Sequence, residues 1–318
     1  MYQSTLYKKE HIANESNSTE IYSQYINHLA SNIPNTIKDF SHPRKRSSTP
    51  TQANSEFLSN REQGDWAEIF LTNAISSALV DFIPIKYGKT DNIVAGEKGF
   101  KEFYKSYQDE LDKIGKRPDI LIFPKDVTQY LPKDISRFDY ESFNKIVPDA
   151  LLGMEIRSSS FLCKKYEEAV NRGEVNGKRK FLGFTLKVED LHVVLKWISQ
   201  FNVPHYYAQV FFDSVYVIPF YKMLQIIINP INKNKLFTVE RNTKNQLKTT
   251  IHININQGLC LGDVDVPPQH SSASRELARG RVLYHVKFEG GNLRVDQGGI
   301  REMLSDAARM KNGDFEGL

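Results

Sequence analysis

Two short apolar runs, each carrying one carboxylate, constrain this chain most strongly. Residues 120–123 (ILIF) directly follow Asp119, and residues 150–156 (ALLGMEI) contain Glu155 in an otherwise apolar segment. Short apolar runs bounded by turn residues are typical of buried strands. A buried carboxylate is costly unless it is paired or bound to a metal. If the two strands are neighbours in one sheet, Asp119 and Glu155 can converge on one point.

The elements around these runs predict an α/β fold with a mixed β-sheet flanked by helices. Apolar periodicity predicts helices at residues 21–29, 64–80, 100–111, 162–171 and 189–201. Strands are predicted at residues 81–87, 118–123, 150–156, 205–212 and 215–219. Beyond residue 230 the sequence becomes β-rich, with hairpins expected around residues 242–246 and at Gly290-Gly291, before a final charged helix.

We therefore expect three regions: a helical and flexible N-terminal arm over residues 1–60, a core over 61–230 and a β-rich part over 231–318 packed on the core as one domain. Asn60 or Asp65 is the expected N-cap of the helix that opens the core. Within the arm, the sequence PRKRSSTP predicts a loop. It is either a solvated linker or an arm that lies along phosphates, with contacts from Arg44, Lys45 and Arg46.

Composition excludes several classes of protein. No stretch reaches the roughly 20 apolar residues of a membrane-spanning helix, and no secretory signal is recognised. The two cysteines have no metal-ligand spacing, so we expect reduced thiols in a cytoplasmic protein. The absence of GxxxxGK[ST], GxGxxG and GxSxG argues against a nucleotide cofactor and against an α/β-hydrolase. The net charge of +4 permits nucleic-acid binding without requiring it.

The two carboxylates suggest a specific chemistry. Oxygen ligands at one point suit Mg²⁺, which takes one or two protein carboxylates together with water and phosphate oxygens. Such a metal would polarise a scissile phosphate and generate hydroxide from bound water. Asp119 could instead cap a turn, and Glu155 could form a structural ion pair with Arg157 or a buried lysine. Pro148-Asp149 is a rival for Pro118-Asp119, but it stands too close to Glu155 for a second paired strand.

Pro118-Asp119 followed by Glu155-Ile156-Arg157 resembles the motif of the PD-(D/E)xK nuclease superfamily. The resemblance implies that Asp119 and Glu155 hold the metal. Arg157 stands where lysine is usual, and because arginine stays protonated it can clamp a phosphate but cannot act as a base. Lys187 is our candidate to supply the ammonium group that the motif lysine usually provides. Alternatively, Lys187 simply faces solvent before a helix. The long spacing between the two halves of the motif implies an inserted segment.

Further segments narrow the resemblance. Ser158 and Ser159 follow the motif as in the "EVKSS" strand end of several restriction endonucleases, and the sequence QGDWAE resembles the helix whose glutamate, here Glu68, approaches the metal. Glu68 could also be an ordinary exposed helix residue. Together with KVEDL and PHYYAQVFFD, residues 60–220 most resemble AccI-type restriction endonucleases.

This resemblance implies a Mg²⁺-dependent type II restriction endonuclease that cuts double-stranded DNA at a short sequence, as a homodimer matched to a palindromic site. Another nuclease of the superfamily and a DNA-binding protein without cleavage are the alternatives. Predicted DNA contacts, besides the basic arm and the two serines, come from cations of the β-rich part: Lys235, Arg241, Lys244 and Lys248.

Overall fold

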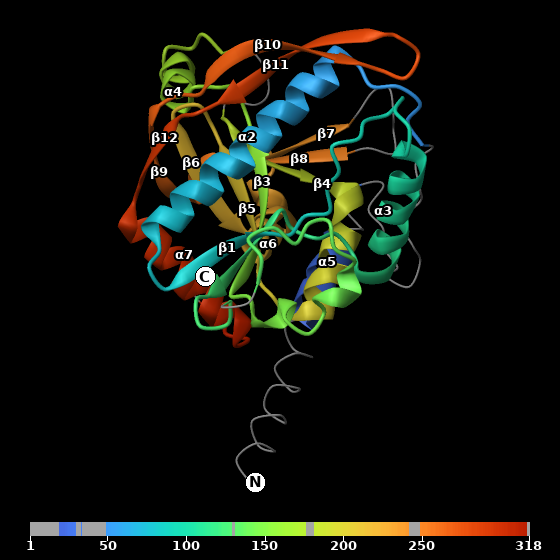
Figure 1. Ribbon diagram of the computed structural model, residues 1–318. Helices are drawn as coiled ribbons and strands as arrows, with labels where there is room; N and C mark the ends of the chain where they lie inside the picture. The colour runs from blue at the N-terminus through green and yellow to red at the C-terminus, as the bar shows by residue number, and fades with distance from the viewer. Residues whose placement is uncertain are drawn as a thin grey trace.

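The computed structural model describes residues 19–29, 33, 49–128, 131–175, 181–241 and 249–316. At its centre is a seven-stranded sheet in the order β1-β2-β3-β5-β6-β9-β12 (Figure 1). The strands are β1 (Phe82–Lys86), β2 (Ile120–Pro124), β3 (Leu152–Ser158), β5 (His205–Val210), β6 (Ser214–Pro219), β9 (Leu259–Val266) and β12 (Asn292–Val295).

The sheet is mixed, as the sequence predicts. β3 and β5 are parallel, whereas the other neighbouring strands are antiparallel. Parallel neighbours require a crossover connection. Here the crossover contains α4 (Cys163–Asn171), β4 (Gly183–Lys187) and α5 (Leu191–Phe201). The expected fold class, a mixed sheet flanked by helices with a β-rich C-terminal part, is confirmed.

Helix α2 (Ser55–Ala78) crosses the face of the sheet turned toward the viewer in Figure 1. It buries Trp66, Phe70 and Leu71 against the sheet, and its exposed side is polar along much of its length.

The expected N-cap at Asn60 or Asp65 is wrong, because Asn54 caps the helix by accepting a hydrogen bond from Phe57 N at 2.7 Å. The boundary expected after residue 60 therefore falls inside α2.

The opposite face of the sheet is covered by α7 (Gln297–Lys311), where Tyr206 Oη donates to the carbonyl of Met303 at 3.3 Å. Residues 19–29 form a helix whose Tyr22 stacks on Phe220, at the start of α6 (Phe220–Ile228). Within the described residues, no helix combines the length and apolar character needed to cross a membrane.

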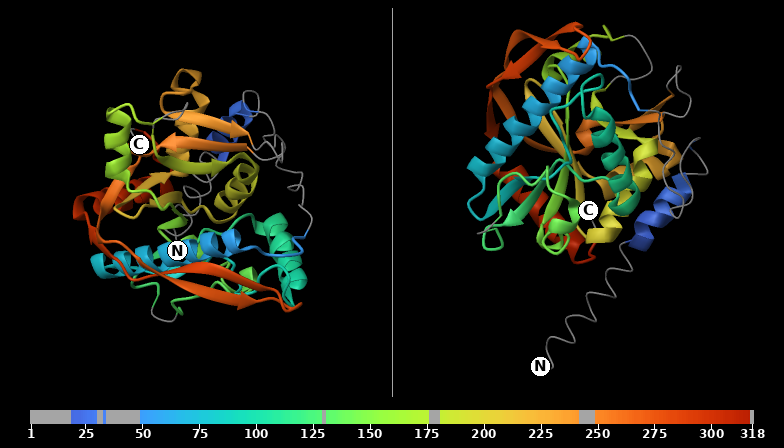
Figure 2. Two further views of the ribbon diagram at one scale, coloured as in Figure 1. Left: turned by 90° about the horizontal axis from the view of Figure 1, so that it is seen from above. Right: turned by 45° about the vertical axis from the view of Figure 1, so that its right-hand side comes forward.

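Two smaller sheets complete the fold. One is three-stranded in the order β4-β8-β7, with β7 (Phe237–Arg241) and β8 (Thr249–Asn254) paired antiparallel as the expected hairpin requires. The other is a two-stranded ribbon of β10 (Gln269–Glu276) and β11 (Val282–Glu289), which lies along α2 (Figures 1 and 2). The hairpin expected at Gly290-Gly291 is wrong, since β11 pairs with β10 whereas β12 pairs with β9.

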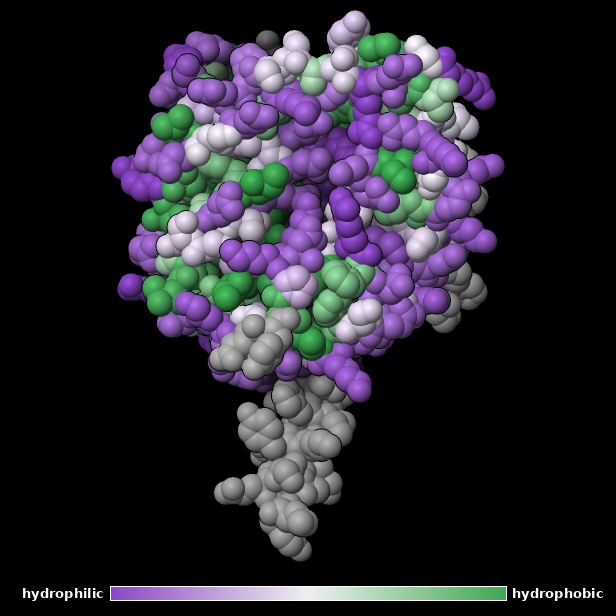
Figure 3. All heavy atoms as spheres, viewed as in Figure 1, coloured by the Kyte–Doolittle hydropathy of each residue, from purple (hydrophilic) through white to green (hydrophobic). Residues whose placement is uncertain are grey.

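The C-terminal strands are shared between these sheets and the central one. β9 pairs with β6, so residues beyond 230 extend the sheet of the core directly. On the face seen in Figure 3, hydrophilic side chains cover the upper centre, while hydrophobic ones gather toward the left. Among the exposed hydrophobic residues of α2 and the segment after it are Ile69, 61% exposed, and Val80, 77% exposed.

Candidate active site

Asp119, directly before β2, lies close to Glu155 on the neighbouring strand β3. β2 and β3 are antiparallel with Ile120 opposite Met154, which brings the start of β2 beside the middle of β3. Asp119 Oδ2 accepts a hydrogen bond from the backbone N–H of Ile156 at 2.6 Å. The structure thus brings together the two carboxylates that the sequence singles out.

Glu155 is held by two cations at one of its two oxygens. Its Oε1 lies 2.5 Å from Lys116 Nζ and 2.6 Å from Arg157 Nη2. Burial alone raises the pKa of Glu155, which is 2% exposed, but Arg157 and Lys116 outweigh burial and hold the pKa at about 2. The carboxylate is therefore ionised, and the ion pair weighed for it from the sequence exists with both an arginine and a lysine.

The second oxygen of Glu155 is different. Oε2 is buried and has no hydrogen-bond partner within the described part of the chain. A buried carboxylate oxygen without a partner is costly. It is also a free ligand atom of the type that hard divalent cations prefer.

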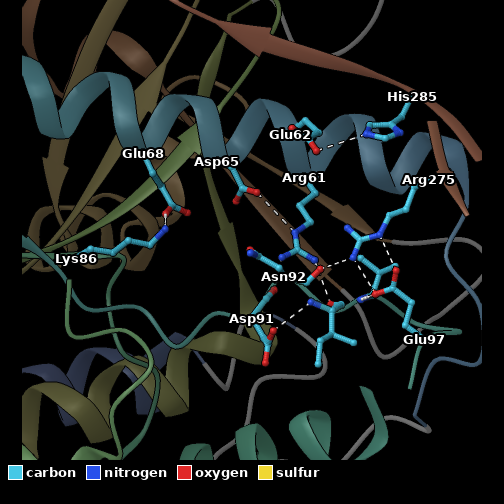
Figure 4. Close-up of polar contacts among 12 residues, drawn as sticks. Arg61, Glu62, Asp65, Glu68, Lys86, Asp91, Asn92, Glu97, Arg275 and His285 are labelled. Atoms are coloured by element: carbon cyan, nitrogen blue, oxygen red, sulfur yellow. Dashed lines mark hydrogen bonds and ion pairs between the residues drawn. The ribbon is translucent and has the colours of Figure 1, made fainter. Parts of the chain in front are cut away.

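Glu68 supplies a third carboxylate from α2. Figure 4 shows it pointing below the helix toward Lys86 of β1, at an Oε2–Nζ distance of 3.5 Å, whereas Glu62 points to His285 of the ribbon. Burial raises the pKa of Glu68 to about 7, opposed by Lys86 and reinforced by Asp65 and Glu155. Glu68 is thus neither solvent-facing nor fully ionised at neutral pH.

The pKa of Asp119 is raised well above its usual range, first by burial and then by the charges of Glu155 and Glu68. The three carboxylates are therefore close enough to oppose one another's ionisation. A divalent cation would relieve both that repulsion and the unsatisfied oxygen, so the donor set fits an oxygen-ligated metal. Within the described ranges, however, no three His, Cys, Asp or Glu side chains already form a metal-binding group.

A cavity of about 120 Å³ lies beside two of the three carboxylates, those of Glu68 and Asp119. Glu68, Lys116 and Asp119 line it together with Gly88. A Cβ atom at Gly88 would lie 3.0 Å from Asp119 Cα and 3.2 Å from Asp119 Oδ1. The glycine therefore leaves the space in which the Asp119 carboxylate sits.

Lys116 is the site residue that our reading of the sequence missed. Its ammonium is mostly buried, and although burial lowers its pKa, the charge of Glu155 outweighs that effect and the net shift is upward. The adjacent Arg117 turns away to pair with Glu110, at 2.7 Å between Nε and Oε1. The Lys-Arg pair directly before Pro118-Asp119 was the available signal, but the sequence does not say which cation faces the carboxylates.

Lys187 lies elsewhere. It lines a separate pocket of about 290 Å³ with Arg157, Ser158 and Ser159, and not the cavity lined by Asp119. The structure thus groups Lys187 with the two predicted DNA-contacting serines and not with the carboxylates.

The other predicted DNA contacts are dispersed. Lys235 is exposed two residues before β7, and Arg241 is exposed at the last position of β7. The remaining five cations lie outside the described residues: Arg44, Lys45, Arg46, Lys244 and Lys248.

Comparison with known proteins agrees with the resemblance found in the sequence. The family model described as AccI restriction endonuclease matches residues 20–176 and 171–309, most of the chain. No curated protein and no solved structure matches the chain. Members of this family are type II site-specific endonucleases that act on double-stranded DNA. The chain belongs to the AccI restriction endonuclease family.

Proposed function

We propose that this endonuclease hydrolyses phosphodiester bonds at a short specific sequence with Mg²⁺ as its metal, using a PD-(D/E)xK site formed by Asp119 and Glu155. The observation that carries the proposal is the Oε2 atom of Glu155, which is buried near Asp119 and Glu68 and has no hydrogen-bond partner among the described residues. Asp119 and Glu155 would hold the ion, with Glu68 as a further carboxylate. When bound, Mg²⁺ supplies a Lewis acid for the scissile phosphate and lowers the pKa of water.

The chain itself contributes positive charge at the same place. Arg157 presents a planar, permanently charged guanidinium that can hold a phosphate through two hydrogen bonds. Lys116 brings an ammonium to the Glu155 carboxylate, and we assign to it the role of the motif lysine in place of Lys187. Both cations orient Glu155, and the negative charge of a phosphate is favoured next to them.

A digest of long, defined DNA by the purified protein, with Mg²⁺ or with EDTA, tests this proposal. We expect discrete bands with Mg²⁺ and intact DNA with EDTA, and mapping the ends gives the recognition sequence. A smear would instead favour a structure-specific or non-specific nuclease of the same superfamily. Intact DNA with every divalent metal would indicate a binding protein, and the metal-site assignment would then be wrong.

We also propose that the active species is a homodimer. Two copies related by a two-fold axis match the symmetry of a palindromic duplex and place one cutting site on each strand. Light scattering of the protein with and without a cognate duplex tests this: a mass of two chains on the duplex is expected, and a single chain bound to the duplex would contradict it.

A further inference from the structure

The 290 Å³ pocket that contains Lys187 adjoins the carboxylate site through one side chain. Arg157 lines the pocket, and its Nη2 atom also contacts Glu155 Oε1 at 2.6 Å. Arg157 is two residues beyond Glu155 on β3, a distance of roughly 7 Å along a strand. A group in the pocket would therefore lie next to whatever occupies the carboxylate site.

The pocket is lined by cationic and hydrogen-bonding side chains together with the apolar Phe161, Leu182 and Phe211. Arg157, Lys187 and His252 bring cationic or ionisable nitrogen, and Ser158, Ser159 and Thr185 bring hydroxyls; no Asp or Glu lines it among the described residues. The cavity on the carboxylate side is lined by three acids, Glu68, Glu110 and Asp119, and by three cations, Lys89, Lys116 and Arg117. The two pockets therefore differ in that carboxylates line only the second one among the described residues.

Lys187 has charges of both signs nearby. Burial is the main cause that lowers its pKa; Asp190 opposes this, Arg157 and Lys116 act in the same direction as burial, and Glu189 opposes it more weakly. His252 already has a carboxylate partner, Glu240, at 3.0 Å. Because Arg157 and Lys187 line the pocket and no described carboxylate does, an anion bound there would be stabilised.

We infer that this pocket binds a backbone phosphate of the cut strand adjacent to the scissile one. The inference rests on the proposed function for its substrate, DNA. A volume of about 290 Å³ lies just below the usual range for small-molecule sites and has room for one phosphodiester group. Arginine, lysine and hydroxyl side chains are the usual partners of DNA phosphates. Contact at this position fixes the strand relative to Glu155.

The first test is the salt dependence of binding. Wild type, Lys187→Ala and Thr185→Val are titrated with a duplex that contains the mapped sequence, in EDTA, at several salt concentrations. Loss of one phosphate contact is expected to reduce the slope of log K against log salt by about 0.9. Thr185→Val removes a hydroxyl without charge, so its affinity falls while its slope is kept. Lys145→Ala is the matched control, because Lys145 is exposed in the segment that leads into the opposite end of β3.

The second test identifies the phosphate. Neutral methylphosphonate replaces one phosphate at a time on either side of the cut. We expect one position where wild type loses roughly tenfold in affinity and Lys187→Ala loses none. If Lys187→Ala keeps the wild-type slope and the wild-type sensitivity at every position, the inference is overturned. If the digest with Mg²⁺ gives discrete bands, that result overturns only the phosphate site and leaves the proposed function intact. If no DNA is cut, the dependence of DNA binding on salt can still be measured.

Free phosphate is the other source of the same anion. Inorganic phosphate is added to wild type and Lys187→Ala, and the melting temperature is followed. Two results together would overturn the assignment to DNA. One is that phosphate raises the melting temperature of wild type but not of Lys187→Ala, and the other is that Lys187→Ala binds DNA with the wild-type salt dependence. The pocket would then bind free phosphate. A reduced DNA slope supports the assignment whether or not free phosphate also binds.

Discussion

Two carboxylate–arginine clusters in this molecule differ chiefly in their burial. In the central sheet, Glu155 on β3 pairs with Lys116 and Arg157, and only 3% of its side chain is exposed. At the ribbon, Arg275 on β10 pairs with Glu97 through two contacts of 2.7 and 2.8 Å, with 29% and 21% of the side chains exposed (Figure 4). In the described part of the chain, the first cluster leaves Oε2 of Glu155 without a hydrogen-bond partner, whereas both oxygens of Glu97 contact Arg275.

The difference separates two uses of charge. The Glu97–Arg275 pair is satisfied within the protein and fixes the ribbon to the segment before α3 (Phe100–Ile114), as a structural contact would. The Glu155 cluster removes three charged groups, Glu155, Lys116 and Arg157, from water. Among the described residues, Oε2 of Glu155 nevertheless has no partner and could bind a cation. Buried charges are weak evidence for stability, so we interpret the Glu155 cluster as a site arranged for ligands from outside the chain.

The largest expected effect is that of Glu155→Ala. It leaves Arg157 without its contact to Glu155 and leaves Lys116 with only the more distant Asp190, at 3.8 Å. We therefore expect the free energy of unfolding, measured by urea denaturation, to fall by about 3 kcal/mol. The matched control is Glu174→Ala, because the pair formed by Glu174 and Arg172 is 55% exposed on both sides. That control should change the free energy of unfolding by less than about 0.5 kcal/mol. Equal losses in both variants would contradict the proposed difference between buried and exposed ion pairs.

Gly88→Ala should affect activity more than stability. The added Cβ lies 3.0 Å from Asp119 Cα, so the carboxylate has to shift by a few tenths of an ångström or more. We expect the rate of DNA cutting to fall by roughly 10- to 100-fold, since small displacements at a reacting centre are costly. Gly298→Ala on α7, where the new Cβ meets only the Asp296 carboxylate at 3.4 Å, is the control. Unchanged cutting by Gly88→Ala would argue against a role for Asp119.

Arg275→Ala sharpens the comparison at the ribbon. Because the pair is partly exposed, we expect a stability loss of only about 1 kcal/mol, together with faster amide hydrogen exchange in β10 and β11 and little change in β2 and β3. Arg294→Ala, which removes a pair whose arginine is 68% exposed, serves as control. Faster exchange across the whole central sheet would mean that the ribbon and the core unfold together.

The smallest effect is a dependence on pH. The hydrogen bonds from Arg275 lower the pKa of Glu97 below its usual value of 4.5. A lowered folded-state pKa contributes stability that is present above the unfolded pKa and is lost as pH falls through the folded one. The stability difference between wild type and Arg275→Ala should therefore shrink below about pH 4.5. A constant difference across that window would exclude the Glu97 carboxylate as the partner that matters.

The sequence predicted the central part of the fold because burial leaves a clear pattern there. β2 and β3 are buried along most of their length, so the carboxylates of Asp119, directly before β2, and of Glu155, within β3, stand out. Lys116 could not be predicted in the same way. Its position depends on Gly115, which ends α3 with a φ of 83° and packs against α5, and on the hydrogen bond from Lys116 N to Val193 O.

The ribbon was not predicted for the opposite reason. β10 reads QHSSASRE, with no apolar alternation, because most of its side chains are exposed. Without a buried face, the sequence does not specify register or partner, and β11 was consequently paired with β12 across Gly290-Gly291. The pairing is set by long-range contacts with α2, such as Trp66 Nε1 donating to the carbonyl of Gly290 at 2.8 Å.

The most direct test of the central claim is to measure cutting and binding by Asp119→Asn on the same duplex, beside Asp149→Asn from the rival Pro-Asp pair. With Mg²⁺, we expect Asp119→Asn to lose cutting by at least roughly 1,000-fold, because it removes a carboxylate from the metal site. Its DNA affinity in EDTA should stay within about threefold of wild type, less than the tenfold that 1.4 kcal/mol would cause. Asp149→Asn should cut normally. Full activity in Asp119→Asn, or its loss in Asp149→Asn alone, would contradict the assignment of the active site to Asp119 and Glu155.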